Sequence, residues 1–264
     1  MSHLFGDSGR AVIVAMDHSV GLGAVDGFEA PGETLRSVLD GRPDGILAGP
    51  HLIRHNEHLL ADTGVDPLVS VDFAASSTVP GEDDGMEIQG RLFGVDTVVP
   101  KDPVAVKTLL VFGRRDGQLY TENKRYVAET CAQFRDRGIP VIVEPTFWGD
   151  LIPAARENEP ELVADASRIA WELGADAVKC PYTGDPDTFG VMVERAPVPV
   201  LVLGGPATGD TPKVLREAQE AVEAGARGIV YGRKIWRSDD PAAVVSALNG
   251  IVHRGRSVAE VWPA

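Results

Sequence analysis

Four charged residues stand in or at the end of short apolar runs of this sequence. Lys107 lies in "AVKTLLVF" and Lys179 in "ADAVKC", while Asp17 ends "AVIVAMD" and Glu144 ends "VIVE". Burying an ammonium or a carboxylate is costly unless the group has a partner of opposite charge or a chemical role. The pattern therefore indicates either a structural network of ion pairs or a site that performs chemistry.

A lysine amine is the group best suited to that chemistry. A neighbouring cation and partial desolvation both lower the pKa of an amine, and a neutral amine attacks a carbonyl carbon to form a Schiff base. Lys179 is the better candidate because Pro181 follows closely and ends a central strand, which places the amine at the rim. Lys107 precedes "TLLVF" and should lie deeper. Glu144 and Asp17 could then move protons on the carbinolamine and the substrate hydroxyl.

Glycines follow two late apolar runs, "VPVLVLGG" and "RGIVYG". Gly204 and Gly205 close the first run, and Gly232 and Arg233 end and follow the second. Bare backbone N–H groups with one cation form a phosphate site, and barrels commonly bind phosphate after strands seven and eight. We expect these four residues to bind a phosphate; the alternative is that the glycines only terminate strands.

Eight short apolar runs must position these residues, and amphipathic helical patterns alternate with them. Their near-continuous apolar character is typical of strands covered on both faces, as in parallel sheets. The runs lie near 10–17, 44–49, 68–72, 104–112, 140–145, 176–180, 198–205 and 227–232.

This alternation over 264 residues predicts an α/β fold, a single (β/α)8 TIM barrel spanning residues 1–264. The third unit, 73–103, should be irregular, because it holds a Gly, Pro and acidic loop and only a short helix candidate. A doubly wound open sheet is the alternative, but "AMDHSVGLG" is not a dinucleotide-binding fingerprint.

Strand parity predicts that the four charged residues converge. Residues along a strand alternate between the barrel interior and the helix-facing side, and function lies at the carboxyl ends of the strands. A small or apolar residue lies two positions before each charged residue, on the same side of the strand. This holds for Asp17, Lys107, Glu144 and Lys179. Cys180 has the opposite parity, so we expect it to pack against the helices.

Composition and charge exclude several classes of protein. The chain is 44% hydrophobic and 24% charged, as in ordinary folded proteins, and its formal net charge of −14 argues against nucleic-acid binding. Two cysteines, Cys131 and Cys180, are too few for a disulfide framework. There is no signal-peptide core and no apolar run near the roughly 20 residues of a membrane span. We expect a cytoplasmic protein without nucleic-acid or membrane partners.

Three histidines suggest a metal site at first sight. His51, His55 and His58 fall at i, i+4 and i+7 on one predicted helical face. Their order is not H-E-x-x-H, and no matching carboxylate spacing follows. We therefore expect solvated helix histidines and no metal or other cofactor, with a metal-dependent barrel hydrolase as the alternative.

Several of these runs resemble a known family. "AVKCPYTGD", "LVLGGP" and "GIVYGRKIW" resemble the archaeal-type class I aldolases of the DeoC/LacD (DhnA-like) family, and "AMDHSVGLG" resembles its first-strand motif. The similarity extends from the first strand to the eighth. It implies that Lys179 is the Schiff-base residue, that Asp17 is an acid/base or hydroxyl ligand, and that His18 belongs to the substrate site.

Strands four and five depart from the archaeal pattern. Archaeal members have a tyrosine proton donor after strand five, where this chain has Thr146. "VIVEPTFWGD" and "AVKTLLVFG" instead resemble the tagatose-bisphosphate and sulfofructose-phosphate aldolase branch, which implies site roles for Glu144 and Lys107. Arg114, just beyond strand four, could meet a second anionic group of the substrate.

The resemblance implies a lyase that makes or breaks a carbon–carbon bond in a phosphorylated ketose. The implied ketose is similar to fructose bisphosphate or is a related sugar phosphate, with a donor of the dihydroxyacetone-phosphate type. A transaldolase or an amino-dideoxy-heptulosonate-type synthase is the alternative within the family. A sugar-phosphate-binding regulator built on an aldolase barrel is the alternative outside catalysis. By resemblance we also expect a homo-oligomer.

Overall fold

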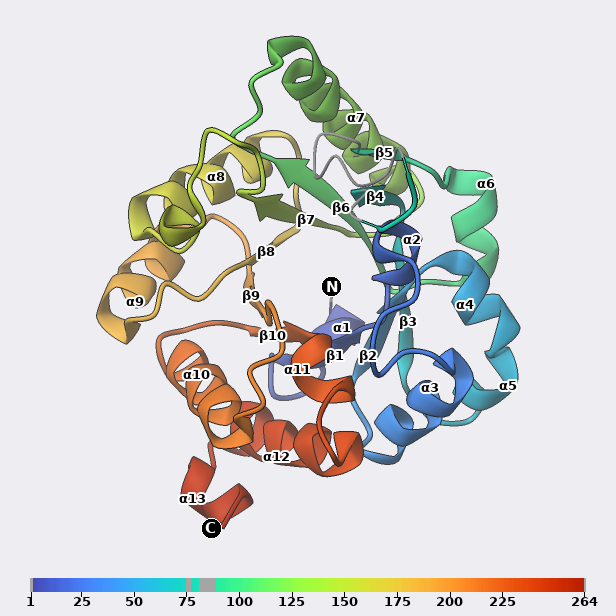
Figure 1. Ribbon diagram of the computed structural model, residues 1–264, viewed down its shortest axis with the longest axis vertical. Helices are drawn as coiled ribbons and strands as arrows, with labels where there is room; N and C mark the ends of the chain where they lie inside the picture. Colours follow the sequence, from blue (N-terminus) through green and yellow to red (C-terminus); the bar gives the residue numbers. More distant parts are fainter. Residues whose placement is uncertain (1, 75–76, 81–88, 264) are drawn as a thin grey trace.

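Eight parallel strands close into a barrel in the computed structural model of this chain, which describes residues 2–74, 77–80 and 89–263 (Figure 1). The barrel strands are β1 (Ala11–Ala15), β2 (Gly45–Ala48), β3 (Asp66–Ser70), β6 (Ala105–Val111), β7 (Val141–Thr146), β8 (Ala177–Cys180), β9 (Val200–Leu203) and β10 (Gly228–Tyr231). They follow one another around the barrel in this order, and β10 pairs with β1 to close it. The predicted (β/α)8 TIM barrel is confirmed.

Helices surround the barrel and connect its strands (Figure 1). The longer ones are α3 (Pro31–Asp40), α4 (Pro50–His55), α7 (Gly117–Arg135), α8 (Pro160–Glu172), α9 (Pro186–Arg195), α10 (Thr211–Glu223) and α12 (Pro241–Arg254). Four of these helices have an aspartate cap at their start, because Asp116, Asp185, Asp210 and Asp240 each accept a hydrogen bond from a backbone N–H of the following first turn.

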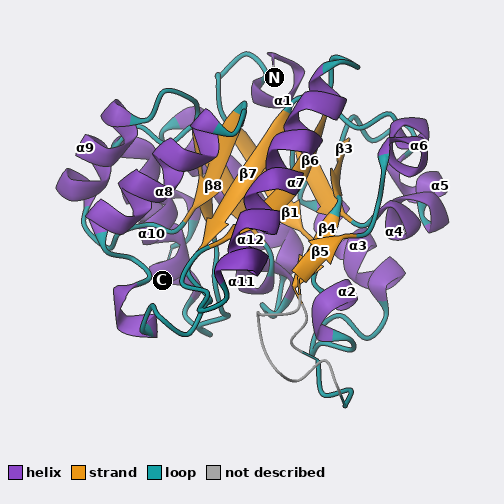
Figure 2. Cartoon of the chain, turned by 90° about the horizontal axis from the view of Figure 1, so that it is seen from above, coloured by secondary structure: helices purple, strands orange, loops and turns teal. Residues whose placement is uncertain are grey.

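Short helices complete the connections and both ends of the chain. They are α1 (Ser2–Phe5), α2 (Ser19–Leu22), α5 (Glu57–Leu60), α6 (Val95–Val98), η2 (Val99–Lys101), η3 (Ala154–Arg156), α11 (Arg233–Trp236) and α13 (Val258–Val261). Figure 2 shows α1 at one end of the barrel, with α2 and α11 at the other. The strands run toward the end that carries α2 and α11, so we call this end the mouth and the α1 end the floor.

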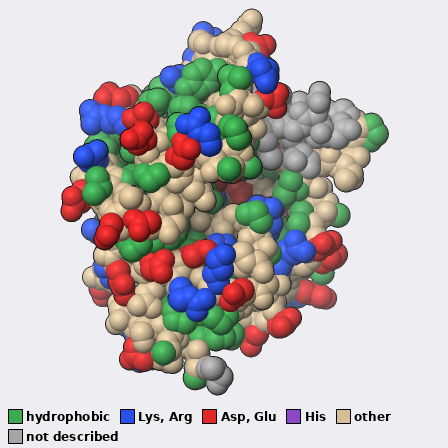
Figure 3. Space-filling model, turned by 60° about the vertical axis from the view of Figure 1, so that its left-hand side comes forward, with side chains coloured by type: hydrophobic (Ala, Val, Ile, Leu, Met, Phe, Trp, Pro, Cys, Tyr) green, Lys and Arg blue, Asp and Glu red, His purple; other side chains and the backbone are tan. Residues whose placement is uncertain are grey.

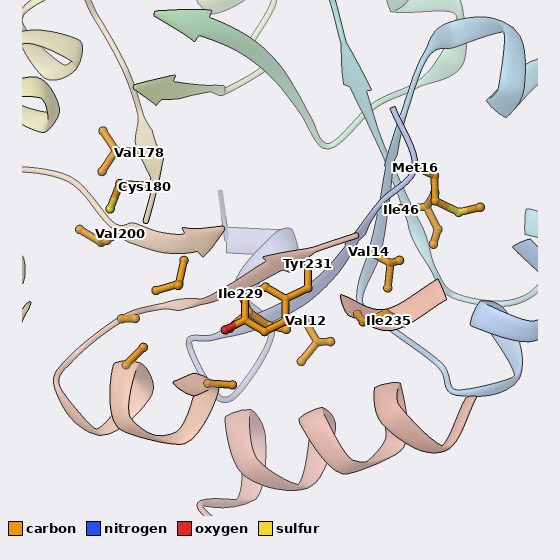
Figure 4. Packing of buried hydrophobic residues seen from close by; sticks show 14 of the residues in the cluster. Val12, Val14, Met16, Ile46, Val178, Cys180, Val200, Ile229, Tyr231 and Ile235 are labelled. Atoms are coloured by element: carbon orange, nitrogen blue, oxygen red, sulfur yellow. The ribbon is translucent and has the colours of Figure 1, made fainter. Parts of the chain in front are cut away.

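Strand side chains form two separate apolar layers, as strand parity requires. The interior layer holds Ala11, Ile13, Ala15, Leu47, Leu68, Ala105, Ile142, Ala177, Leu201 and Val230, and it also includes Leu4 and Phe5 of α1. The outer layer packs between the strands and the helices. Cys180 lies there with Val178 and Val200, as predicted from its parity (Figure 4).

The third unit departs from the regular alternation, as predicted, but its details differ from the expected single strand at 68–72. β3 ends at Ser70, and Asp72 begins β4 (Asp72–Ala74), which pairs antiparallel with β5 (Gln89–Arg91) in a separate two-stranded sheet. Part of the predicted acidic loop, 81–88, lies outside the described residues. The first predicted strand is also too long, since β1 ends at Ala15.

Charged side chains of both signs are interspersed on the face shown in Figure 3. The formal net charge of the chain is −14. Among the described residues, none of the helices combines the length and the apolar character that crossing a bilayer requires.

Candidate active site

A cavity of about 690 Å³ opens at the mouth of the barrel. It is lined by Asp17, Lys107, Glu144 and Lys179, so the structure brings together the four charged residues that the sequence singles out. Asp72, which the sequence analysis gave no role, lines it as well.

A chain of ion pairs connects these side chains. Lys179 Nζ lies 2.9 Å from Glu144 Oε1, and Lys107 Nζ lies 3.4 Å from Glu144 Oε2. Lys107 Nζ is also 3.0 Å from Asp17 Oδ2 and 3.9 Å from Asp72 Oδ1. Glu144 therefore bridges the two lysines. Its negative charge offsets the repulsion expected between the two neighbouring ammonium groups.

Strand register sets the depth of each amine. Lys107 pairs with Ile142, and Ile142 pairs with Ala177, which lies two residues before Lys179 on β8. Glu144 likewise lies two residues beyond Ile142. Lys179 and Glu144 thus stand side by side at the upper level, while Lys107 enters from one level below, as expected.

Burial and neighbouring charges shift the pKa values of this cluster in opposite directions. Burial alone would lower the pKa of Lys107, but Asp17, Glu144 and Asp72 outweigh it and raise the pKa of this amine above its ordinary value. Burial alone would raise the pKa of Asp17, but Lys107 and Lys179 outweigh it and hold the pKa below its ordinary value. The Lys107 ammonium and the Asp17 carboxylate are therefore both charged at neutral pH.

His18 lies beside this cluster at the start of α2. Its Nδ1 is 3.8 Å from Asp17 Oδ1, and its ring meets the Trp236 ring edge-on with centroids 5.4 Å apart. Burial lowers the pKa of His18 to about 4, and the charges of Lys179 and Arg233 act in the same direction against Asp17. His18 is thus a neutral imidazole at the cavity wall at neutral pH.

The residues predicted to bind a phosphate line the same cavity. Gly204 and Gly205 follow β9, and Gly232 and Arg233 follow β10. Gly205 has φ +68°, which favours glycine, and a side chain at Gly232 would collide with the His18 ring at 2.6 Å. Arg233 is half-buried, and its Nε has no hydrogen-bond partner among the described residues.

Two further predicted positions have different surroundings. Thr146 lies on the inward side of β7 and lines the cavity; its buried hydroxyl has no hydrogen-bond partner in the described part of the chain. Arg114 is buried, 7% exposed, and is not one of the described residues that line the cavity. The structure therefore does not bring Arg114 to the site where it was expected to meet an anionic group.

Asp72 is a functional candidate that sequence reasoning missed. Its Oδ2 accepts hydrogen bonds from the Thr108 hydroxyl, the Leu109 backbone N–H and the Tyr126 hydroxyl, at 2.9, 2.6 and 2.7 Å. Its Oδ1 faces Lys107. Burial raises the pKa of Asp72 in spite of these partners. The available signal was an acidic residue ending the apolar run "LVSVD", the same pattern that identified Asp17.

A second set of cavity side chains that sequence reasoning missed lies near the residues predicted to bind a phosphate. Lys234 of α11 forms an ion pair with Glu217 of α10, and both side chains line the cavity. Tyr182, which follows β8, also lines it and donates a hydrogen bond to Glu220 at 3.0 Å. These contacts join segments far apart in the sequence, and no local motif marks them.

The three histidines lie outside this cavity. The expected single helical face is wrong, because α4 ends at His55, Asn56 interrupts the helix, and His58 belongs to α5. His51 and His55 stack with ring centroids 6.1 Å apart, and all three side chains are exposed. Within the described residues, no group of three His, Cys, Asp or Glu side chains is arranged to hold a metal ion.

Comparison with known proteins gives a consistent result. A family model described as DeoC/LacD family aldolase matches residues 11–238. An uncharacterized aldolase of Saccharolobus solfataricus is 30% identical over 98% of this chain and 95% of its own length. The class 1 fructose-bisphosphate aldolase of Thermoproteus tenax is also 30% identical, over 97% of this chain and 95% of its own.

A solved structure extends the similarity to three dimensions. It is an archaeal fructose-1,6-bisphosphate aldolase with the catalytic Lys covalently bound to the carbinolamine intermediate of its substrate. The two chains are 28% identical and superpose with a TM-score of 0.81, covering 95% of this chain and 96% of the other.

Proposed function

Because the chain belongs to the DeoC/LacD family of aldolases, we propose that Lys179 is the Schiff-base residue through which it cleaves or forms a carbon–carbon bond in a phosphorylated ketose. The protein is a class I aldolase, a lyase. The observation that supports Lys179 is the contrast between the two amines. Lys107 contacts three carboxylates that raise its pKa, whereas the ion pair of Lys179 is with Glu144. A permanently protonated amine is a poor nucleophile.

The proposed reaction requires no group beyond the side chains and water. The Lys179 amine adds to the ketone carbon C2, and loss of water gives an iminium. A base takes the C4 hydroxyl proton, the C3–C4 bond breaks, and its electron pair moves into the iminium as the aldehyde leaves. Protonation of the resulting enamine at C3 and addition of one water release dihydroxyacetone phosphate and the free amine.

Glu144 is the proposed proton carrier of this cycle. Its Oε1 lies 2.9 Å from Lys179 Nζ, within the distance that proton transfer needs. Lys107 and Asp17 form a 3.0 Å pair beside it, suited to binding substrate hydroxyls and to keeping Glu144 oriented. His18, neutral at pH 7, completes the wall beside Asp17 as a hydroxyl ligand.

We place the substrate phosphate at Gly204, Gly205, Gly232 and Arg233. β9 is the barrel neighbour of β8, so this group stands beside Lys179 and suits a phosphate on C1, next to the ketone. The unpartnered Arg233 Nε supports this placement, because a guanidinium and backbone N–H groups are strong phosphate donors.

We propose a cytoplasmic homo-oligomer made of a single catalytic domain, 1–264. Both cysteines are free and buried, which suits a reducing compartment. The oligomer follows from the family resemblance, and light scattering of the purified protein measures it directly.

Borohydride trapping tests the central assignment. Wild-type protein incubated with dihydroxyacetone phosphate and borohydride should carry a reduced adduct on the peptide containing Lys179, read by mass spectrometry. Lys179→Met should abolish both the adduct and turnover, since Met keeps the packing of the stem and removes the amine. Lys107→Met is the matched control and should keep the adduct. An adduct on Lys107 in the wild type would reverse the two roles.

A further inference from the structure

Among the described residues, the cavity has one cation without an ion pair, and this cation can bind a phosphate. Its cationic side chains among the described residues are Lys107, Lys179, Arg233 and Lys234. Lys107 and Lys179 are paired with carboxylates of the catalytic cluster, and Lys234 is paired with Glu217. Only Arg233 of this set has no ion pair to a described residue. The remaining residues, 1, 75–76, 81–88 and 264, contain no Lys or Arg in the sequence.

The wall opposite Arg233 is mainly apolar, although Asn158 also lines it. Around the barrel β3 lies diametrically across from β9, and β6 across from β10. The segments that line this side are β4, which follows β3, the connection from β7 to α8, and α2, which follows β1 and packs on β4. Figure 1 shows α2 and β4 across the mouth from α10. The apolar side chains they contribute to the cavity are Val20, Leu22, Phe73, Ala74, Phe147 and Trp148.

Local contacts hold this wall in place. α2 lies directly on β4, since a side chain at Gly21 would fall 2.2 Å from the Ala74 carbonyl oxygen. Phe147 is buried and stacks on Phe112 with ring centroids 6.0 Å apart. The carboxyls on this side are those of Asp72 and the half-buried Glu157. The cation on this side among the described residues is Lys107 of β6, which is buried and already paired with carboxylates.

The substrate then lies across the cavity with its phosphate end at the β8 to β10 side and its aldehyde end at the opposite wall. Phosphate at Gly204 and Arg233 and the ketone carbon at Lys179 occupy the β8 to β10 side. The carbons beyond the bond that breaks then extend past Glu144 toward the apolar wall. A phosphate on those carbons would lose its hydration against apolar side chains and face acidic groups, and Lys107, the cation of this side among the described residues, is already paired with carboxylates.

We propose that the enzyme selects ketose monophosphates and that the aldehyde half of its substrate is uncharged. This rests on the proposed function and deepens it. It differs from the bisphosphate named for the Thermoproteus tenax relative. Arg114, the one candidate for a second phosphate contact, is buried and absent from the described cavity lining.

A matched pair of substrates tests this selectivity. Fructose 1-phosphate and fructose 1,6-bisphosphate differ only in the phosphate on C6, which belongs to the aldehyde half. The wild-type kcat/KM for cleavage should be about tenfold or more higher for the monophosphate, because the C6 phosphate of the bisphosphate would lose hydration without gaining a charge-assisted contact. Equal values, a preference for the bisphosphate, or no cleavage of the monophosphate overturns the proposal.

Added cations should reverse the preference. Trp148→Arg and Val20→Arg each place a guanidinium on the partly exposed rim of the apolar wall. Either should raise kcat/KM for the bisphosphate by about tenfold without raising it for the monophosphate. Leu151→Arg is the control, because Leu151 is exposed on the same connection as Trp148 and does not line the cavity. A gain for the bisphosphate as large in Leu151→Arg as in the wall variants contradicts a local effect.

Failure of this inference and failure of the proposed function give different results. Dihydroxyacetone phosphate contains no aldehyde half, so its borohydride adduct on Lys179 does not depend on the apolar wall. An adduct without selectivity for the monophosphate overturns only the inference about the aldehyde half. Absence of the adduct overturns the class I assignment of Lys179.

Discussion

At the scale of single residues, the site separates two lysines that look alike in the sequence. Lys107 contacts three carboxylates and is held as an ammonium, whereas Lys179 stands one level higher beside Glu144. The same carboxylate serves both amines, so Glu144 can balance the charge of Lys107 while it exchanges protons at Lys179. Two adjacent lysines thus take different roles because of the carboxylates around them.

Glu144→Gln should depress kcat by about 10²–10⁴, the usual contribution of a general acid or base. Borohydride trapping on Lys179 should survive in part, because the amine remains. Thr146→Val is the matched comparison on the same strand and should be mild. Steady-state kinetics and trapping on both variants decide the assignment. A strongly reduced kcat in Thr146→Val together with a near-normal kcat in Glu144→Gln would assign the proton donor to Thr146.

His18 should make the stability of the protein sensitive to mild acid. Burial lowers its pKa from 6.5 to about 4, with Lys179 and Arg233 adding to the effect and Asp17 and Glu144 opposing it. Between these values the unfolded chain binds a proton that the folded protein does not. Stability is therefore lost as pH falls from about 6.5 to 4, by at most about 1.4 kcal/mol per pH unit from this group.

Urea unfolding between pH 7 and 4 measures this contribution. His18→Asn should flatten the pH dependence in that window, and His55→Asn, a change at an exposed histidine, should leave it as in the wild type. An unchanged slope in His18→Asn would contradict the neutral, buried imidazole.

At the scale of elements, α7 supports the strand that carries Lys107. Asn123 of α7 accepts a hydrogen bond from the Val111 N–H at 2.8 Å and donates to the Leu109 carbonyl at 3.0 Å. Tyr126, one turn later, donates to Asp72 and also to the Leu109 carbonyl. The helix thus satisfies backbone groups of β6 and orients the carboxylate behind Lys107.

Asn123→Ala should lower the free energy of unfolding by about 1–3 kcal/mol, because it removes the side-chain acceptor of the buried Val111 N–H and one of two side-chain donors to the Leu109 carbonyl. Arg125→Ala, on the exposed face of the same helix, should change it by no more than about 0.5 kcal/mol. Denaturant unfolding of the two variants makes the comparison. Equal stability would mean that other groups or water replace the asparagine.

At the scale of the whole molecule, the barrel has a closed floor and an open mouth. Leu4 and Phe5 of α1 pack into the interior layer at the floor, while the cavity opens at the other end (Figure 2). The inner apolar layer separates the two ends. Stability at the floor and chemistry at the mouth should therefore be separable by mutation.

Leu4→Ala should destabilise the protein by about 2–5 kcal/mol, the usual result of truncating a buried leucine. Turnover of the folded enzyme should remain that of the wild type, because the cavity lies at the opposite end. Thermal unfolding and kcat/KM measured below the transition test both statements. Val191→Ala, at an exposed site, is the control; a loss of turnover in Leu4→Ala would show that the two ends are coupled.

The sequence by itself determined the barrel and most of the inward-facing site. Near-continuous apolar runs alternating with helical patterns specify parallel strands, and parity within "AVK", "VIVE" and "DAVK" directs Lys107, Glu144 and Lys179 to the interior. These features are local, so they can be recognised in the linear chain. Family motifs at strands one, six, seven and eight then indicated the aldolase chemistry.

Only the tertiary structure decided which side chains meet. Glu144 bridges two lysines because β7 lies between β6 and β8, and Asp72 reaches Lys107 because the chain leaves β3 for a second sheet. Arg114 follows β6 by a few residues yet is buried away from the described cavity lining. Such contacts depend on barrel closure and on the paths of the connecting segments, which join residues far apart along the chain, and no spacing within one segment encodes them.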